Sequence, residues 1–237
     1  MTTPVPDLEA VHDLESIRSL GTCAVANAIE SFGVRLRNEG FTDGSIRAIL
    51  PHLPPSVGHA VTIRIRCSAP PAVGPNYIEH TSWWDHVLAM PWPRILVIED
   101  VDPMPGTGAL VGEVHASILD ALGVVAVVTN GSVRDLPAVG AMGFNLFASR
   151  VSVSHAYAHL VEIGARVQVG GLAIAPGDLL LGDVHGVVSI PTEIRHRLPA
   201  AAQAISRREA TLLQVARKRP VSVEELRAAV ERAQATR

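Results

Sequence analysis

Two short apolar runs, separated by a glycine-rich segment and a helical pattern, constrain the fold of this chain more than any other feature. Residues 95–98 and 124–128 are continuous apolar runs, which are typical of strands buried on both faces. Between them lie the glycine-rich segment 106–112 and a helical pattern over 116–122, which Gly123 ends. This order of strand, loop, helix and strand predicts a crossover unit with two parallel strands.

Helices are predicted at both ends of the chain. Apolar residues at helical spacing indicate a helix over 8–20, and Thr22 is expected to cap a second helix. A helical tail is predicted over about 192–237, where Ser222 and Glu225 have the spacing of a capping box. Because no repeat or linker divides the sequence, residues 1–237 are expected to form one domain with this tail.

Alternating and interrupted apolar patterns predict further strands. Residues 59–67 alternate, so Val61 and the apolar residues at two-residue spacing should face the core, with Thr62 and Arg64 on the opposite side. The proline-rich segment 69–76 is predicted to be a loop. Short apolar runs divided by glycine predict antiparallel hairpins, at residues 167–169, 172–174, 179–181 and 187–190. The sequence alone therefore predicts an α/β fold with antiparallel hairpins.

Composition argues against several classes of function. The formal net charge is −3 at pH 7 and the basic run at 216–219 is best explained as a solvated helix end, so nucleic acid is not an expected partner. No apolar run approaches the ~20 residues that cross a membrane, and the first ten residues lack the pattern of a secretory signal. Cys23 and Cys67 have no metal or redox spacing and are expected to pack as small hydrophobes. A cytoplasmic protein without a membrane partner is expected.

A single lysine, Lys218, stands among the twenty basic residues. An aldolase that forms a Schiff base, or a pyridoxal enzyme, needs a desolvated lysine in its pocket, and a phosphate-binding P-loop needs one after its glycines. Lys218 lies in a polar, arginine-rich segment that fits none of these sites. If this chain breaks carbon–carbon bonds, a metal ion is the expected electron acceptor.

Arg134 and Asp135 close a segment, 129–135, that directly follows the predicted strand at 124–128. Ligands of α/β sheets gather at the carboxyl ends of strands. A guanidinium can hold a substrate carboxylate through two parallel hydrogen bonds, and a carboxylate can bind a hard divalent cation such as Mg²⁺. An ordinary loop ion pair or a helix-capping aspartate explains the same two residues, so the pair alone does not decide between these roles.

Residues 112–115 stand at a predicted helix start. Free backbone N–H groups at such a start attract an anion, including a substrate carboxylate. Glu113 could orient a metal-bound water there. Taken alone, Glu113 is better explained as a complement to the helix dipole.

Together these segments resemble the RraA-like family, which includes the 4-hydroxy-4-methyl-2-oxoglutarate aldolases. The resemblance rests on Gly112-Glu113 and on Gly131-Ser132-Val133-Arg134-Asp135, with twenty residues between Glu113 and Arg134. Further segments agree with the family pattern, at residues 58–62, 169–172, 176–178 and 182–188, with Pro191 after the last of them. The resemblance covers roughly residues 14–215.

The resemblance implies a swivelling ββα sandwich with a mixed sheet and C-terminal helices, assembled as a homotrimer or hexamer with the site between protomers. It also implies a metal-dependent lyase acting on a small 2-oxo acid, by retro-aldol cleavage through a pyruvate enolate or by oxaloacetate decarboxylation. In this family the residue equivalent to Arg134 binds the substrate carboxylate, and the residue equivalent to Asp135 binds the metal. The residue equivalent to Glu113 holds metal-bound waters. Mg²⁺ is the expected metal, with Mn²⁺ as a substitute. The oxo acid would also contact the backbone amides of Gly112, Glu113, Val114 and His115.

The sequence departs from the family pattern at three positions. Ala138 stands where the family often has an acidic residue, three positions after the metal aspartate. His115 replaces an alkyl residue, and His185 replaces an acidic or amide residue. These changes suggest a branch of the family with its own substrate.

Three other polar residues have open roles. His155 and His159 would share a helix face if their segment is helical, and ordinary polar packing explains them as well. Glu209 could reach the site of a neighbouring protomer or simply face solvent. The family also contains an inhibitor of a ribonuclease that acts by protein contact, so a non-catalytic regulatory protein is the alternative function. The complete site motif favours the lyase, and the lack of a suitable glycine-rich nucleotide loop argues against a methyltransferase.

Overall fold

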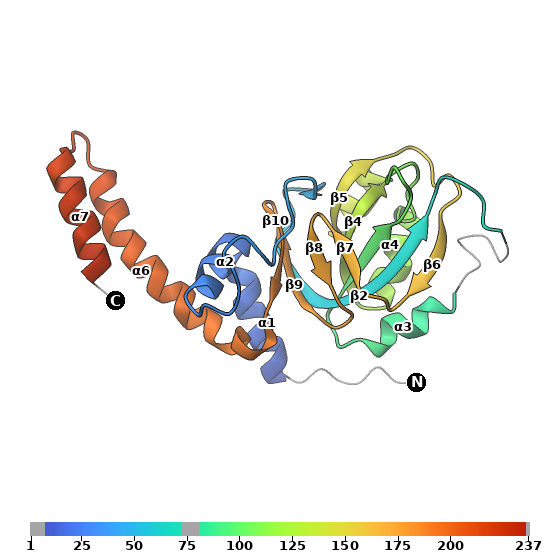
Figure 1. Ribbon diagram of the computed structural model, residues 1–237, viewed down its shortest axis with the longest axis horizontal. Helices are drawn as coiled ribbons and strands as arrows, with labels where there is room; N and C mark the ends of the chain where they lie inside the picture. The colour runs from blue at the N-terminus through green and yellow to red at the C-terminus, as the bar shows by residue number, and fades with distance from the viewer. Residues whose placement is uncertain (1–7, 73–80, 236–237) are drawn as a thin grey trace.

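The protein is described by a computed structural model over residues 8–72 and 81–235. Within these residues, eight strands form a mixed sheet in the order β1-β5-β4-β3-β2-β9-β10, and β6 also pairs with β2 (Figure 1). The strands of this sheet are β1 (Arg47–Ala48), β2 (Ser56–Arg66), β3 (Arg94–Asp100), β4 (Val124–Val133), β5 (Asn145–Val151), β6 (His159–Ile163), β9 (Leu179–Asp183) and β10 (Gly186–Ile190). The expected mixed α/β architecture is confirmed.

Four parallel strands, β2 to β5, form the centre of the sheet. Val61 pairs with Leu96, Leu96 with Val127, and Val127 with Leu146. Each connection between these strands contains a helix, namely α3 (Trp83–Ala89), α4 (Glu113–Ala121) and α5 (Leu136–Ala141). The predicted parallel crossover between β3 and β4 is therefore confirmed. It places the carboxyl ends of these strands at one edge of the sheet.

Both faces of the central strands are buried, as their continuous apolar sequences predict. One face packs on α3 and α4 in the largest core cluster, and the other is covered by β7 (Val167–Val169) and β8 (Leu172–Ile174). Thr62 lies on the covered face, is 0% exposed and has no hydrogen-bond partner for its hydroxyl among the described residues. The prediction that Thr62 faces away from the core is therefore wrong. Its local pattern does not show that a distant hairpin covers this face.

The predicted antiparallel hairpins are confirmed. Gln168 pairs with Ala173 in the separate β7–β8 sheet, and Leu181 pairs with Val188 in the β9–β10 hairpin. Of the predicted loop at 69–76, residues 69–72 contain no helix or strand, and residues 73–76 lie outside the described part of the chain.

Two amino-terminal helices, α1 (Leu8–Leu20) and α2 (Thr22–Glu30), agree with the predicted ones, but Thr22 is not the cap of α2. The N-cap residue is Gly21, with a φ of 77°. Asp183 accepts hydrogen bonds from the Thr22 backbone N–H (2.8 Å) and from the Thr22 hydroxyl (2.7 Å). The cap of α2 is therefore a carboxylate 161 positions away, which a local pattern does not reveal.

Arg94, at the start of β3, is a buried arginine that joins the ends of two helices. Its Nε donates to the carbonyl of Met90 (2.8 Å), Nη1 to that of Leu122 (2.9 Å) and Nη2 to that of Leu88 (3.3 Å). The carbonyls at a helix C-terminus carry partial negative charge, so they stabilise a guanidinium without a carboxylate. Arg94 therefore holds α3 and α4 against the sheet.

The C-terminal helical tail is present as predicted. It contains a 3₁₀ helix (Thr192–Arg197), α6 (Leu198–Ala216) and α7 (Val223–Ala235), and α6 and α7 form a hairpin that projects away from the sheet (Figure 1). The capping box is confirmed, because the Ser222 N–H donates to Glu225 Oε2 (2.8 Å) and the Glu225 N–H donates to Ser222 Oγ (3.2 Å). None of the described helices has the length and apolar character needed to span a membrane.

Candidate active site at the carboxyl ends of the parallel strands

Arg134 and Asp135 follow directly on the end of β4. The strand runs through residues 129–133, which were expected to come after it. The pairing with β5 shifts between Thr129 and Ser132, so this part of β4 is irregular and its sequence lacks a clear strand pattern. Both site residues are half-buried, with 25% of the Arg134 side chain and 35% of the Asp135 side chain exposed.

Gly112 brings the start of α4 against this pair. Val111 forms a parallel bridge to Val133, and the Arg134 backbone N–H donates to the carbonyl of Val111 (3.1 Å). A Cβ on Gly112 would overlap Asp135 Oδ2 and would lie 2.9 Å from Arg134 Cγ. Glycine therefore allows the close approach of the α4 segment to the Arg134 and Asp135 side chains.

The Asp135 side chain is oriented by its own backbone and by α4. Asp135 adopts the left-handed conformation (φ 56°, ψ 38°), which is uncommon for a residue other than glycine. Its Oδ2 accepts the backbone N–H of Glu113 (3.1 Å) and lies 3.5 Å from Nη1 of Arg134. The other oxygen, Oδ1, makes no hydrogen bond that the described residues show. Asp135 thus connects the first N–H of α4 with the start of α5.

Arg134 holds a hydrogen-bond donor without an acceptor. Its Nε is buried and has no partner among the described residues. Leaving a buried charged donor unpaired costs free energy, so such groups usually find an acceptor in the protein, in water or in a ligand. The 3.5 Å contact with Asp135 is too long to be a strong hydrogen bond. The guanidinium can therefore bind a second anion, placed closer to it than the Asp135 carboxylate.

The first residues of α4 complete this group of predicted residues. Glu113 is exposed at the helix start, and 53% of the next residue, Val114, is exposed. His115 is buried, with 6% exposed. Burial, and secondly the charge of Arg134, lowers the pKa of His115 to about 4. The imidazole is therefore neutral at pH 7. The predicted catalytic and substrate-binding residues meet at one place.

The two histidines that could have shared a helix face do not do so. His159 begins β6, and His155 lies in the turn before it. The Nδ1 atom of His155 is 2.7 Å from the carbonyl oxygen of Ala156, and Nδ1 of His159 is 2.7 Å from that of Tyr157. The condition for a shared helix face is not met, because His159 lies in β6, which pairs with β2.

Two departures from the family pattern, His185 and Ala138, and the open residue Glu209 occupy separate elements. His185 lies in the β9–β10 turn, with Nδ1 3.1 Å from Asp183 Oδ1. Ala138 is a half-buried residue of α5, and Glu209 is exposed on α6 in the projecting hairpin.

The sequence patterns did not reveal a buried cluster of Cys67, Asp100 and Asp102 beside this edge of the sheet. Their ligand atoms lie within 4.8 Å of one another, close enough to share a metal ion. Asp102 accepts the N–H groups of Cys67 (2.7 Å) and Ser68 (2.8 Å) on Oδ2, and the Ser68 hydroxyl (2.7 Å) on Oδ1. Asp100 accepts the N–H groups of Gly106 (2.7 Å) and Asp102 (3.1 Å). The acidic run at the end of β3 was the one available sign of this cluster.

Without an ion, the electrostatics of this cluster keep the thiol protonated. Burial raises the pKa of the Cys67 thiol to about 12, and the carboxylates of Asp100 and Asp102 add to that shift. Burial also raises the pKa of Asp100, whereas hydrogen-bond donors outweigh burial at Asp102 and lower its pKa. A protonated thiol is a weak ligand.

Cys67 is buried as expected, but Cys23 is exposed, so the prediction that Cys23 packs as a small hydrophobe is wrong.

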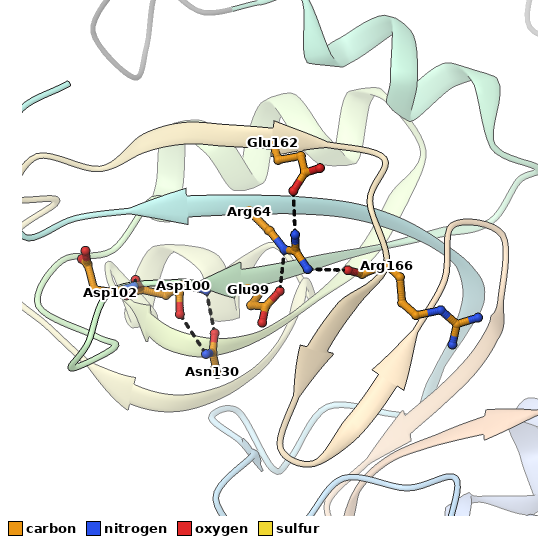
Figure 2. Close-up of polar contacts among 7 residues, drawn as sticks. All are labelled: Arg64, Glu99, Asp100, Asp102, Asn130, Glu162 and Arg166. Atoms are coloured by element: carbon orange, nitrogen blue, oxygen red, sulfur yellow. Dashed lines mark hydrogen bonds and ion pairs between the residues drawn. The ribbon is translucent and has the colours of Figure 1, made fainter. Parts of the chain in front are cut away.

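Side-chain bridges fix the strands behind this edge, as Figure 2 shows. Arg64 on β2 donates from Nε to Glu99 (2.8 Å) and from Nη1 to Glu162 (2.6 Å), which joins β2 to β3 and β6. The Asp100 N–H donates to Asn130 Oδ1 (2.7 Å), and Asn130 Nδ2 donates to the Asp100 carbonyl (3.0 Å). These bonds hold the ends of β3 and β4 together, which gives the candidate site a rigid support.

Comparisons with known sequences identify the family of the chain. The chain matches the family model described as RraA-like, Aldolase/RraA, over residues 22–189. It is 31% identical over 86 residues to a protein of Halalkalibacterium halodurans named as a candidate 4-hydroxy-4-methyl-2-oxoglutarate aldolase, a match of 36% of this chain and 41% of that protein. It is also 34% identical over 88 residues to an uncharacterized protein of Methanocaldococcus jannaschii, covering 37% of this chain and 42% of that protein. The chain thus spans about two fifths of the length of the curated relatives it matches.

Solved structures share the fold at low sequence identity. An uncharacterized protein from Pseudomonas syringae pv. tomato superposes with a TM-score of 0.70 and 20% identity over the whole of both chains. RraAS2 of Streptomyces coelicolor, described as an unusual member of the RNase ES inhibitor RraA family, superposes with a TM-score of 0.66 and 20% identity over 86% of this chain and 96% of that one. The family model covers well over half of the sequence, so the chain belongs to the RraA-like family, described as Aldolase/RraA.

Proposed function

We propose that this protein is a divalent-metal-dependent lyase that acts on a small 2-oxo acid at the site around Arg134 and Asp135. The reaction would be retro-aldol cleavage of a 4-hydroxy-2-oxo acid, decarboxylation of oxaloacetate, or both. The observation that carries this proposal is the convergence of a guanidinium, a carboxylate and a helix N-terminus at Gly112. Membership of the RraA-like family and the relative named as a candidate aldolase support it.

Arg134 is the proposed carboxylate-binding residue. Its buried Nε lacks an acceptor among the described residues, and a carboxylate can accept from Nε and a terminal nitrogen in parallel. The N–H groups at the start of α4 bring the positive end of the helix dipole to the same place. Arg134 and the backbone of residues 112–115 would therefore hold the oxo acid in one orientation.

Asp135 and Glu113 fit a hard divalent cation. Asp135 Oδ1 is not used by a hydrogen bond in the described structure, and a carboxylate oxygen is a ligand that Mg²⁺ prefers. Asp135 would hold Mg²⁺ or Mn²⁺, and the exposed Glu113 carboxylate would accept hydrogen bonds from waters on the ion. When bound, the cation supplies a Lewis acid for the electron pair that bond cleavage leaves beside the 2-oxo group.

The buried cluster of Cys67, Asp100 and Asp102 fits such a cation less well. Its carboxylate oxygens already accept backbone N–H groups or a hydroxyl, and burial keeps the thiol protonated. A metal would have to displace these bonds and a proton. Asp135 is therefore the proposed ligand.

The position of Lys218 also supports metal-assisted rather than Schiff-base chemistry. Lys218 is the single lysine of the chain, and it is exposed after the end of α6. A lysine that forms a Schiff base at neutral pH has its pKa lowered by burial or by neighbouring cations in a pocket. An exposed amine lacks that burial.

We further propose that a neighbouring protomer covers the site in a homotrimer or hexamer. Large apolar side chains are exposed on the segments that flank it in the chain, with 75% of Met104, 53% of Val114 and 54% of Val151 accessible in the single chain. Met104 lies in the connection that leads to Gly112, Val114 follows Glu113, and Val151 ends β5. Large exposed apolar side chains on these segments favour burial in a protein interface.

The proposed function is tested by pyruvate release from a panel of 4-hydroxy-2-oxo acids and oxaloacetate in the presence of Mg²⁺. Asp135→Asn keeps the side-chain shape but removes the charge that would hold the cation, so turnover should fall at least ~100-fold. Asp120→Asn, at an exposed position of the same helix α4, is the matched control and should keep wild-type turnover. Full activity of Asp135→Asn would contradict the assignment, and an inactive wild-type protein under every metal condition would favour the regulatory function.

A further inference from the structure

A cavity lies at the opposite end of the parallel strands from the candidate active site. It has a volume of about 310 Å³, which is within the range of small-molecule sites. Its walls come from α1, from the segments that lead into β2 and β3, and from the first residues of β4 and β5. Because the amino ends of β3 to β5 meet here, this cavity is separated from Arg134 and Asp135 by the length of the sheet.

Trp92 provides an aromatic wall in this cavity. The residue is 43% exposed and its indole packs against Gly123, where an added Cβ would lie 2.8 Å from Cδ1 and 3.3 Å from Nε1. The glycine thus lets the backbone support the ring at close range. Leu14 and Val125 add apolar walls. A flat ring can stack against an indole held in this way.

Asn145 and Ser56 supply one acceptor and one donor in the same cavity. Asn145 is 5% exposed, and its Nδ2 donates to the Pro54 carbonyl and to Ser56 Oγ, each at 2.8 Å. Both amide protons are used, so the Asn145 carbonyl remains to accept a hydrogen bond. Ser56 Oγ accepts from Asn145, which leaves its O–H to donate. An amide group on a ligand carries the matching N–H and C=O.

The charged residues that line the cavity neutralise one another. Arg18 donates from Nε to Glu15 Oε2 (2.7 Å) and from Nη2 to Glu15 Oε1 (2.6 Å), and its Nη1 donates to the Pro55 carbonyl (3.3 Å). Each guanidinium nitrogen therefore already has an acceptor. A ligand carboxylate would find no free cation here, and it would face the carbonyl of Asn145 and the carboxylate of Glu15. An uncharged ligand suits the cavity better.

We propose that this cavity is a second ligand site, for a small, planar, uncharged molecule that carries an amide. The ring stacks on Trp92, the amide N–H donates to the Asn145 carbonyl, and the amide C=O accepts from the Ser56 hydroxyl. The site does not use Arg134 or Asp135, so ligand binding there can be tested independently of the lyase function.

Benzamide is the probe, and benzoate is the matched control ligand, because it keeps the ring but replaces the amide with a carboxylate. The full chain, labelled with ¹⁵N, is titrated while the Trp92 indole N–H and the Asn145 side-chain amide are followed by NMR. Benzamide should shift both signals saturably, with a dissociation constant on the order of 1 mM, as expected for a ligand of this size. Benzoate should bind at least ~10-fold more weakly.

Two variants test whether the cavity itself binds the probe. Trp92→Ala removes the exposed ring, and Val125→Phe fills the space from a half-buried position, so each should weaken benzamide binding at least ~10-fold. In the Trp92→Ala variant the Asn145 amide is the reporting signal. Tyr157→Ala removes an aromatic ring that is 56% exposed outside the cavity and should bind benzamide as the wild type does.

Shifts that do not saturate, equal affinity for benzoate, or binding that both cavity variants leave unchanged would overturn this proposal. Asp135→Asn should retain wild-type affinity for benzamide even if its lyase activity is lost. A failure of the second site and a failure of the lyase function are therefore separate results.

Discussion

Arg134 and Asp135 lie where β4, α4 and α5 meet, and this position decides what each side chain can do. The carboxylate of Asp135 is anchored on one oxygen by the Glu113 N–H, whereas the buried Nε of Arg134 has no acceptor among the described residues. Asp135 is therefore oriented by the protein itself, and Arg134 keeps a buried donor that an anion can use. Arg134 and Asp135 could be identified as candidate site residues from the sequence, because both follow an apolar strand and match a family motif.

Arg134→Lys is expected to be almost as damaging as Arg134→Ala. A lysine keeps the positive charge but cannot donate two parallel hydrogen bonds to one carboxylate. Loss of this contact should cost about 2–4 kcal/mol of transition-state binding, which is roughly a 30- to 1000-fold loss of kcat/KM. Steady-state pyruvate release measures the effect, and a lysine variant within a few-fold of the wild type would exclude a role as a carboxylate clamp.

Asp183→Asn should lower the free energy of unfolding at neutral pH and should make that free energy vary less as the pH falls. Burial alone would raise the pKa of Asp183, but hydrogen bonds from Thr22 and His185 outweigh it and lower the pKa below its ordinary value of 3.8. A lowered folded-state pKa means that the carboxylate stabilises the fold above about pH 4, and that this contribution is lost as the pH falls through the folded-state pKa.

The asparagine variant should therefore lose about 1–2 kcal/mol of the free energy of unfolding at pH 7, and its difference from the wild type should shrink at low pH. Urea unfolding at pH 7 and pH 3 measures both quantities. An equal difference at the two pH values would show that the charge of Asp183 does not cap α2.

Residues whose environment is set by distant segments were the ones that the sequence did not predict. Thr62 is buried by the β7–β8 hairpin, and the true cap of α2 comes from Asp183 rather than from Thr22. Periodicity within a strand or helix describes only its own neighbours, so it carries no information on such contacts.

At the level of elements, the approach of α4 to the end of β4 depends on one glycine. A Cβ at Gly112 would overlap Asp135 Oδ2 and press on the Arg134 side chain, so Gly112→Ala must move the pair. A displacement of ~1 Å at a reacting group can cost ~100-fold in rate, and that is the loss of kcat/KM expected here.

The matched control for Gly112→Ala is Gly44→Ala, because an added Cβ at Gly44 meets nothing within 4 Å. This variant should keep wild-type activity and a wild-type melting temperature. If Gly112→Ala also kept full activity, the close approach of α4 would not matter for the site.

Elements with a strong apolar period were predicted, and those with an irregular or marginal pattern were not. The parallel crossover of β3, α4 and β4 was visible from continuous apolar runs and a glycine-rich connection. The end of β4 was missed because its pairing with β5 shifts after Thr129. The six-residue helix α5 follows a left-handed Asp135 and contains a proline, so it has no helical period to detect.

At the scale of the whole molecule, the parallel strands separate two regions of different character. Their carboxyl ends carry the charged residues of the proposed lyase site, and their amino ends form the neutral cavity lined by Trp92 and Asn145. The mixed sheet was predictable as a class, while the pairing of β6 and β9 with β2 was not, because such pairings join distant segments.

The central claim, that a divalent cation held at Asp135 makes this protein a lyase, is tested most directly by pyruvate release before and after treatment with EDTA. We predict that EDTA abolishes pyruvate release by the wild-type protein and that Mg²⁺ or Mn²⁺ restores it. The single lysine of the chain is exposed, so no buried lysine is available to form the protonated imine that would otherwise accept the electrons. Asp135→Asn should stay inactive when the metal is returned. Release that is unchanged by EDTA would contradict the claim.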